Sequence, residues 1–290
     1  LGNIRYFKRL PEGTECGVAT SKVINLSDVF GDSDQTNKFV TRYLQSTHCD
    51  LFFADAAILV EGAAESMLLP HFIRSKFPEL YQRYITILGV NGRHAHRLSP
   101  LIEKLCLPTL VISDLDPAEK EGHHKSVVPK RGEGQISGNY AIAKWLMKEK
   151  DIDKLLDCSE DKKEISFASP YQFSIRIAYQ TPVKVDFEGD EKEAIPGTFE
   201  DCLIYTNYDL FKKIEITESG NLVDKTHNLL NSTDTFETIH EKIYGMLREG
   251  KSKWKAEFAL DIIFEINPDE LSVPPYINQG LIWLQNYLHL

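Results

Sequence analysis

The sequence contains little cysteine, no long apolar run and no excess of positive charge. Its five cysteines are scattered through 290 residues and form no Cys-x-x-Cys pair, which argues against a disulfide framework and a zinc site. A helix that spans a bilayer needs about 18 to 20 apolar residues, and no stretch of the chain approaches that length. We therefore expect a cytoplasmic protein with reduced thiols and no membrane partner.

Positive charge is outweighed by negative charge. The chain has 33 Lys and Arg against 43 Asp and Glu, a formal net charge of −10. Proteins that bind nucleic acids usually present a basic surface, so this balance argues mildly against a polyanionic partner. Acids that bind divalent cations reverse the argument locally, because the bound cations attract phosphate. The position of the acids therefore matters more than their number.

The chain begins at Leu1 and shows no basic segment followed by an apolar one, so no signal peptide is indicated. We expect it to be part of a longer protein. Its length allows one large domain or two smaller ones. We interpret residues 1–45 as a lead-in from an upstream region, residues 46–215 as the main domain and residues 216–290 as a helical domain.

Short apolar strands alternate with helices after residue 55. Strands are expected at 57–60, 84–90 and 110–112, and helices at 63–77 and 98–106. Nearly continuous apolar strands joined through helices indicate a parallel sheet covered on both faces. Right-handed crossovers place the carboxyl ends of these strands at one edge, where open sheets bind ligands. The predicted fold class is α/β, with a parallel sheet flanked by helices and a smaller helical domain.

The downstream half is expected to add further strands and several helices. The pattern predicts a helix at 139–150, β structure within 165–185 and a helix that starts within 196–201. Three tail helices are expected, one that opens at Asp234, one at about 254–264 and one after Pro275. The first tail helix would begin at a capping box formed by Asp234 and Glu237.

Four carboxylates lie where two of the expected strands end. Glu61 follows the first strand, and Glu65 lies in the first turn of the next helix, where the helix dipole favours an acid in any protein. Asp114 and Asp116 flank one residue after the third strand, so both point to the same side if strand geometry persists. Together these acids fit shared divalent cations, with Mg²⁺ as the natural candidate. The alternative for the aspartates is a solvated Asp-x-Asp turn.

These acids belong to a recognisable sequence motif. Ile58-Leu-Val-Glu-Gly-x-x-Glu65 followed by Val111-Ile-Ser-Asp-Leu-Asp116 resembles the Toprim domain of topoisomerases, DnaG-type primases and some nucleases. Phe52-Phe-Ala-Asp-Ala-Ala57 and Lys255-Ala-Glu-Phe-Ala259 further resemble the C-terminal region of OLD (overcoming lysogenization defect) family nucleases. In that family an N-terminal ABC-type ATPase precedes a Toprim nuclease region that carries a helical domain. The resemblance covers roughly residues 40–265.

The resemblance implies a metal-dependent DNA endonuclease or nickase with two Mg²⁺ or Mn²⁺ ions. It assigns metal binding to Glu61, Glu65, Asp114, Asp116 and Glu200, and catalytic roles to Glu61 and to Lys255 near the scissile phosphate. Asp201 and Glu188 compete with Glu200 for its role. The implied partners are DNA and the ATPase region of the same protein. ATP would bind only to that ATPase region, which lies outside this chain. A homodimer is left open, and a role in phage defence is implied by the family.

Two alternatives belong to other functional classes. Gly245-Met-Leu-Arg-Glu-Gly-Lys-Ser252 fits the P-loop pattern of nucleotide-binding proteins. A P-loop must follow a buried strand, however, and an amphipathic helix is expected before Gly245. The second alternative is a catalytically silent Toprim module that only binds DNA, and the full set of acids argues against it.

Overall fold

The computed structural model describes residues 4–10, 18, 20–29, 34–46, 48–90, 94–121, 125–168, 171–249 and 251–289. The strands are β1 (Arg5–Leu10), β2 (Thr20–Asn25), β3 (Ala56–Val60), β4 (Ile85–Gly89), β5 (Thr109–Ile112), β6 (Pro117–Ala118), β7 (Ile136–Ser137), β8 (Glu164–Phe167), β9 (Phe173–Ala178), β10 (Val183–Phe187) and β11 (Asp190–Ala194). The α-helices are α1 (Gln35–Ser46), α2 (Ala63–Lys76), α3 (Pro78–Tyr81), α4 (Ser99–Leu105), α5 (Ile152–Leu156), α6 (Phe199–Thr206), α7 (Tyr208–Lys213), α8 (Leu222–Leu230), α9 (Phe236–Glu249), α10 (Lys251–Glu265) and α11 (Pro275–His289). Shorter helical segments are η1 (Cys49–Phe52), η2 (Ala95–Leu98), η3 (Ala141–Leu146), η4 (Glu160–Lys163) and η5 (Pro268–Glu270). Among the described helices, none is both long and apolar enough to cross a membrane.

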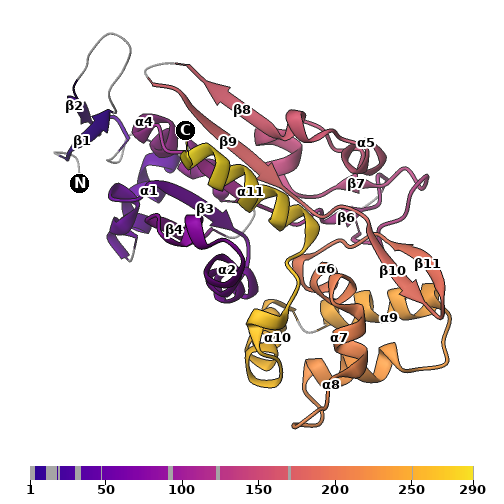
Figure 1. The fold of residues 1–290 in the computed structure, drawn as a ribbon. Helices are drawn as coiled ribbons and strands as arrows, with labels where there is room; N and C mark the ends of the chain where they lie inside the picture. Colours follow the sequence, from indigo (N-terminus) through magenta and orange to yellow (C-terminus); the bar gives the residue numbers. More distant parts are fainter. Residues whose placement is uncertain are drawn as a thin grey trace.

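A five-stranded sheet forms the centre of the fold. Its strand order is β4-β3-β5-β9-β8, and the first four strands are parallel while β8 runs antiparallel to β9 at the edge. The strands expected at 57–60, 84–90 and 110–112 are β3, β4 and β5, and the region 165–185 supplies β8, β9 and the start of β10. The predicted α/β fold, with a mostly parallel sheet flanked by helices, is confirmed (Figure 1).

Both faces of the sheet are covered by helices. Alternate residues of a strand point to opposite faces, and all five residues of β3 are buried. Ala56, Ile58 and Val60 pack in the cluster that includes α2, α6, α10 and α11, whereas Ala57 and Leu59 pack in the cluster that includes α1 and α4. This two-sided burial explains why the strands read as unbroken apolar runs.

The last helix returns to the sheet. Helix α11 contacts β5 and β9, whereas α10 packs against α2 and α8 (Figure 1). Gly280 allows the close approach of α11, because a Cβ at this position would lie 2.8 Å from Leu110 Cδ1. The division of the chain at residue 215 stays a prediction. The structure adds that the third tail helix packs on the sheet.

Two helix boundaries differ from the sequence prediction. The helix expected at 139–150 is limited to the π-helical segment η3, because Lys148 has a φ of 54° and so cannot continue a right-handed helix. The capping box at Asp234 is also wrong. Helix α9 begins at Phe236, and Thr235 Oγ1 accepts a hydrogen bond from the Thr238 backbone N–H at 3.3 Å. Asp234 instead forms an ion pair with Lys242.

The segment that fits the P-loop pattern does not follow a strand. Gly245 lies inside α9, and Lys251 is the first residue of α10. A P-loop wraps phosphate with the backbone of a loop between a buried strand and a helix. The helix before Lys251 leaves no such loop between Gly245 and Glu249, and the structure contradicts the nucleotide-binding alternative at this position.

Candidate active site

The six residues named from the sequence meet at the carboxyl edge of the sheet. Glu61 and Asp114 follow β3 and β5, while Glu65 and Glu200 lie in the first turns of α2 and α6. Lys255 reaches the same place from α10, and Asp116 lies in the loop after β5. The structure therefore brings these side chains together from five elements, while their individual roles stay a prediction.

Glu61 is held by two polar side chains that the sequence analysis did not identify. Ser113 Oγ and Asn139 Nδ2 both donate hydrogen bonds to Glu61 Oε1. Asn139 is itself fixed, because its Oδ1 accepts a hydrogen bond from the Ala141 backbone N–H at 2.9 Å. Burial, with added repulsion from nearby aspartates, raises the pKa of Glu61 to about 8. The carboxyl group thus has a set orientation and binds a proton readily.

Asp114 accepts hydrogen bonds from three parts of the fold. Its Oδ1 accepts from the Phe199 backbone N–H and from Gln180 Nε2, both at 2.9 Å, and its Oδ2 accepts from Lys255 Nζ at 2.9 Å. The Phe199 N–H belongs to the first residue of α6, where the helix dipole favours a negative charge. Gln180 also donates to the Tyr276 hydroxyl at 3.2 Å. Asp114 is therefore linked to α6, α10 and, through Gln180, to α11.

The backbone conformation at Asp116 differs from the one predicted from the sequence. Strand β5 ends at Ile112, and Asp116 has a φ of 46°, so the assumption of continued strand geometry is wrong. Asp116 lines a pocket of about 170 Å³, whereas Asp114 is buried behind it. Burial and the charge of Asp114 raise the pKa of Asp116 to about 6. The charge of Asp114 thus acts on Asp116, although strand geometry does not continue from one residue to the other.

Glu65 and Glu200 are the most deeply buried acids of the site. Each is 1% exposed, and the oxygens of both carboxylates lack a hydrogen-bond partner of good geometry within the described residues. Burial raises the pKa of both groups, that of Glu65 strongly. Glu200 has an ion-pair partner in Lys255, whereas Glu65 has none among the described residues, and a buried carboxylate without a partner is costly. This arrangement is unusual for a helix cap and is typical of groups that bind a ligand.

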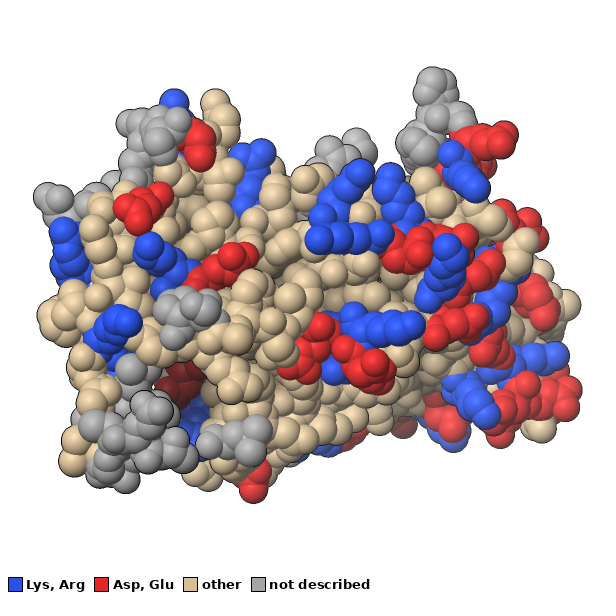
Figure 2. Space-filling model, turned by 90° about the horizontal axis from the view of Figure 1, so that it is seen from above, with Lys and Arg blue, Asp and Glu red and all other residues tan. Residues whose placement is uncertain are grey.

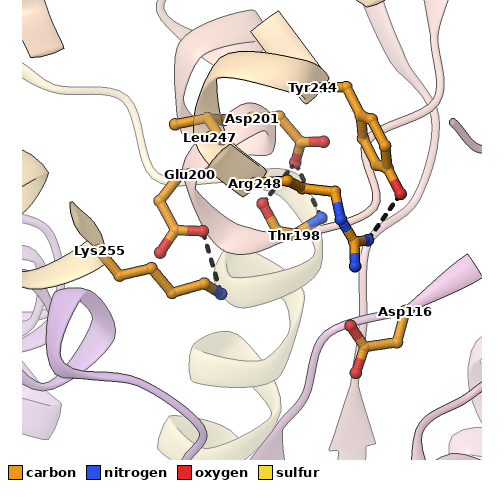
Figure 3. Close-up of a pocket in the computed structure, with 8 residues that line it drawn as sticks. All are labelled: Asp116, Thr198, Glu200, Asp201, Tyr244, Leu247, Arg248 and Lys255. Carbon is orange, nitrogen blue, oxygen red and sulfur yellow. Dashed lines mark hydrogen bonds and ion pairs between the residues drawn. The ribbon is translucent and has the colours of Figure 1, made fainter. Parts of the chain in front are cut away.

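The two acids that competed with Glu200 lie in other surroundings. Asp201 forms a capping box, in which its carboxylate accepts hydrogen bonds from the Gly197 and Thr198 backbone N–H groups at 2.9 Å. Glu188 is exposed in the turn between β10 and β11. Glu200 is thus the acid of this group that faces Lys255 (Figure 3).

Lys255 is the cation at the centre of the acids. Its Nζ lies 2.9 Å from Asp114 Oδ2 and 3.3 Å from Glu200 Oε2. Burial by itself lowers the pKa of a lysine, but Asp114, Glu200 and Glu65 together raise the pKa of Lys255 well above its ordinary value. The ammonium group is therefore charged and partly neutralises the cluster.

The donor set fits hard divalent cations. Carboxylate oxygens are the ligands that Mg²⁺ and Mn²⁺ prefer, and Glu65 and Glu200 present buried oxygens without hydrogen-bond partners of good geometry among the described residues. Over the described part of the chain, no three His, Cys, Asp or Glu side chains converge at the spacing of a preformed metal site. The Lys255 ammonium lies between two of the acids instead.

Sequence reasoning missed the residues that orient the acids. A signal for Gln180 was present, because this polar residue lies two positions after the carboxyl end of the buried strand β9. For Asn139 no local pattern existed, since its contact with Glu61 joins residues 78 positions apart. Tyr276 lies still farther from Gln180 in the sequence.

Known proteins resemble parts of this chain. The family model described as "Overcoming lysogenization defect protein-like, TOPRIM domain" matches residues 52–116. The chain is 29% identical over 261 residues to Endonuclease GajA of Bacillus cereus (strain HuB5-5), covering 88% of this chain and 35% of that protein. It thus spans about a third of this relative's length. A solved structure, the C-terminal region of the Burkholderia pseudomallei OLD protein, aligns with a TM-score of 0.40 and 17% identity over 81% of this chain and 99% of that chain.

The matched segment runs from Phe52 to Asp116 and so contains four of the six candidate site residues, Glu61, Glu65, Asp114 and Asp116. It also contains β3, β4 and β5 of the central sheet. The resemblance to OLD-type Toprim proteins is confirmed, and this chain carries an OLD-like Toprim domain at residues 52–116.

Proposed function

We propose that this chain is the nuclease region of a longer OLD-type protein and that it hydrolyses DNA phosphodiester bonds with the help of divalent metal ions. The observation that carries the proposal is the set of buried acids around Lys255, two of which, Glu65 and Glu200, lack hydrogen-bond partners of good geometry among the described residues. The Toprim domain match and the relative named as an endonuclease support a nuclease assignment.

In this proposal Glu61, Glu65, Asp114, Asp116 and Glu200 hold two Mg²⁺ or Mn²⁺ ions. Bound ions of this kind activate a water molecule and stabilise the leaving oxygen in phosphodiester hydrolysis. The raised pKa values of Glu61 and Asp116 mean that these side chains release protons when cations bind. Ser113 and Asn139 keep Glu61 in one orientation while this exchange occurs.

Lys255 has a second role in the proposed reaction. In the structure the Lys255 ammonium group forms ion pairs with both Asp114 and Glu200. If cations held by those acids took over their charge, the Lys255 ammonium would be able to contact the scissile phosphate and offset the charge that develops there. Its position on a helix outside the sheet, in α10, allows the ammonium group to move without disturbing the strands.

The whole protein is proposed to couple this region to an N-terminal ATPase, which would be the only site of ATP binding. DNA is the proposed partner, a homodimer is a further part of the proposal, and a role in phage defence follows from the family. On the face seen in Figure 2, basic and acidic side chains are interspersed. DNA contact is therefore expected to depend on local cations near the acids rather than on one broad basic surface.

Plasmid cleavage in Mg²⁺ or Mn²⁺ tests the proposal. We expect Glu61→Gln, Asp114→Asn and Lys255→Met to reduce the cleavage rate by about 100-fold or more, because each removes charge at the reacting centre. Glu241→Gln changes an exposed acid on α9 and is the matched control. Thermal unfolding of each variant verifies that it is folded. Cleavage by all three site variants at the wild-type rate would refute the nuclease assignment. If the wild-type protein binds DNA but does not cleave it, the result would favour the catalytically silent Toprim module.

A further inference from the structure

A pocket next to the acids is lined on its other side by helix α9. The pocket has a volume of about 170 Å³, with Asp116, Glu200 and Lys255 on the side of the acids and Tyr244, Leu247 and Arg248 on the side of α9 (Figure 3). It is open enough to admit a group from solvent, because Arg248 is exposed. A ligand that enters this pocket meets the proposed metal ligands and Arg248 together.

Arg248 is positioned by a neutral group. Its Nη1 donates a hydrogen bond to the Tyr244 hydroxyl at 2.7 Å, and its guanidinium lies 5.3 Å from the centre of the Tyr244 ring. Tyr244 is one turn earlier on α9, and its side chain is buried. The tyrosine therefore restricts the arginine without neutralising its charge.

Several other basic residues of the described chain are paired with acids. Lys255 is paired with Asp114 and Glu200, and Arg131 is paired with Asp157 and Glu193. Within the described residues, no ion pair joins Arg248 to a carboxylate, although the charge of Arg248 acts on Asp116, which lines the same pocket. An oriented guanidinium that keeps its charge at the mouth of a pocket is a suitable group for an anion.

We propose that Arg248, oriented by Tyr244, binds a backbone phosphate of the DNA next to the bond that is cut. The inference rests on the proposed nuclease function and extends it by naming a substrate-binding residue on the helical part of the chain. A guanidinium presents several N–H donors that match phosphate oxygens, so a phosphodiester is the ligand class that this geometry suits. Arg248 then fixes the strand while the acids and Lys255 act on the neighbouring phosphate.

The test compares Arg248→Ala, Arg248→Lys and Tyr244→Phe with wild type and with Lys242→Ala. Lys242 is an exposed cation on the same helix that is paired with Asp234, so its removal controls for general loss of charge. Affinity for a DNA duplex is measured by fluorescence anisotropy in Ca²⁺ at several salt concentrations, with a gel to verify that the duplex is intact. Cleavage kinetics in Mg²⁺ separate KM from kcat.

We expect Arg248→Ala to weaken binding about tenfold and to lower the salt-dependence slope by about 1, because one phosphate contact is lost. The loss should appear in KM, with kcat changed less. Arg248→Lys should recover part of the affinity and the salt slope, and Tyr244→Phe should weaken binding about threefold. Lys242→Ala should match wild type.

Two outcomes overturn the inference. One is an Arg248→Ala variant that binds DNA with wild-type affinity and salt slope. The other is an equal loss in Lys242→Ala, which would indicate general charge rather than a specific contact. Failure of the wild type to cleave with any divalent cation refutes the proposed function instead. The binding measurements remain decisive for Arg248 in that case, since they do not depend on cleavage.

Discussion

Replacement of Gly62 by alanine should displace the Glu65 carboxylate while leaving the fold intact. Gly62 precedes α2 with φ −124° and ψ 172°, an extended conformation that any residue adopts. A Cβ at this position would lie 2.5 Å from Glu65 Oε2. Carbon and oxygen atoms that are not bonded need roughly 1 Å more than this. The atom that must move is the end of a flexible side chain, so the backbone can stay in place.

The expected effects on stability and on metal binding differ in size. Alanine is less favourable than glycine at the N-cap position of a helix, so the replacement should lower the unfolding free energy by about 0.5–1 kcal/mol. A metal ligand tolerates only about 0.2 Å of error in its distance. A shift of roughly 1 Å should therefore remove Glu65 from the proposed site and weaken cation binding by about 10–100-fold, which is about 1.4–2.7 kcal/mol.

Calorimetric titration with Mn²⁺ measures this loss directly. Gly62→Ala and Glu65→Gln should show similar reductions in affinity, and urea unfolding should show that Gly62→Ala is folded. Gly245→Ala is the matched control, because among the described residues outside the local helix backbone no atom lies within 4 Å of a Cβ at Gly245. That glycine is inside α9, so the control should gain about 0.5–1 kcal/mol of stability and bind Mn²⁺ as wild type does.

Two results would refute the reasoning. Wild-type affinity for Mn²⁺ in Gly62→Ala, with affinity lost in Glu65→Gln, would show that the metal-binding position of Glu65 is not the one next to Gly62. A loss of several kcal/mol of stability in Gly62→Ala would show that the backbone, and not the carboxylate, takes up the clash.

Three further predictions concern buried polar groups. Asn139→Ala should lower the unfolding free energy by about 1–3 kcal/mol in urea titration, because Glu61 and the Ala141 N–H lose a buried partner; an unchanged midpoint contradicts this. The pKa of Glu61 is raised to about 8 and that of Asp116 to about 6, so the folded protein binds more protons than the unfolded chain. The contribution of these two acids to stability in EDTA should therefore fall as pH rises from about 4 to 8, and Mn²⁺ should raise the Tm more at pH 8 than at pH 5. A larger Tm rise at pH 5 would contradict this prediction. Burial lowers the pKa of His240 to about 4, so this group contributes in the opposite direction. Its own share of the stability falls by up to about 3 kcal/mol as pH decreases from about 6.5 to 4, and the difference between wild type and His240→Gln measures it. His240→Gln should flatten the acid side of a Tm profile, and an unchanged acid limb counts against the assignment.

Local patterns predicted the centre of the fold well. The strands β3, β4 and β5 were expected from short apolar runs bounded by helices. This signal is local because β3 and β5 are buried on both faces, while β4, at the edge of the sheet, is partly buried. Boundaries set by single residues were harder to predict. The left-handed conformation of Lys148 ends η3, and Thr235 rather than Asp234 caps α9.

The acids of the site were also recognisable, because chain order places an acid directly after a strand and parallel topology brings such residues to one edge. What the motif could not show is how each carboxylate is held. Asp114 and Asp116 diverge because Asp116 leaves strand geometry, and Asp114 is oriented by Gln180 and by the N-terminus of α6.

By itself the sequence determined the parallel sheet, the strands that Glu61 and Asp114 follow, and the resemblance to OLD-type Toprim proteins, because apolar periodicity and short motifs are properties of neighbouring residues. Only the tertiary structure decided that Lys255 lies between Asp114 and Glu200, that Asn139 holds Glu61, and that α11 packs on the sheet. These contacts join residues far apart in the chain, and they form only when helices pack on a completed sheet and bury the charges between them.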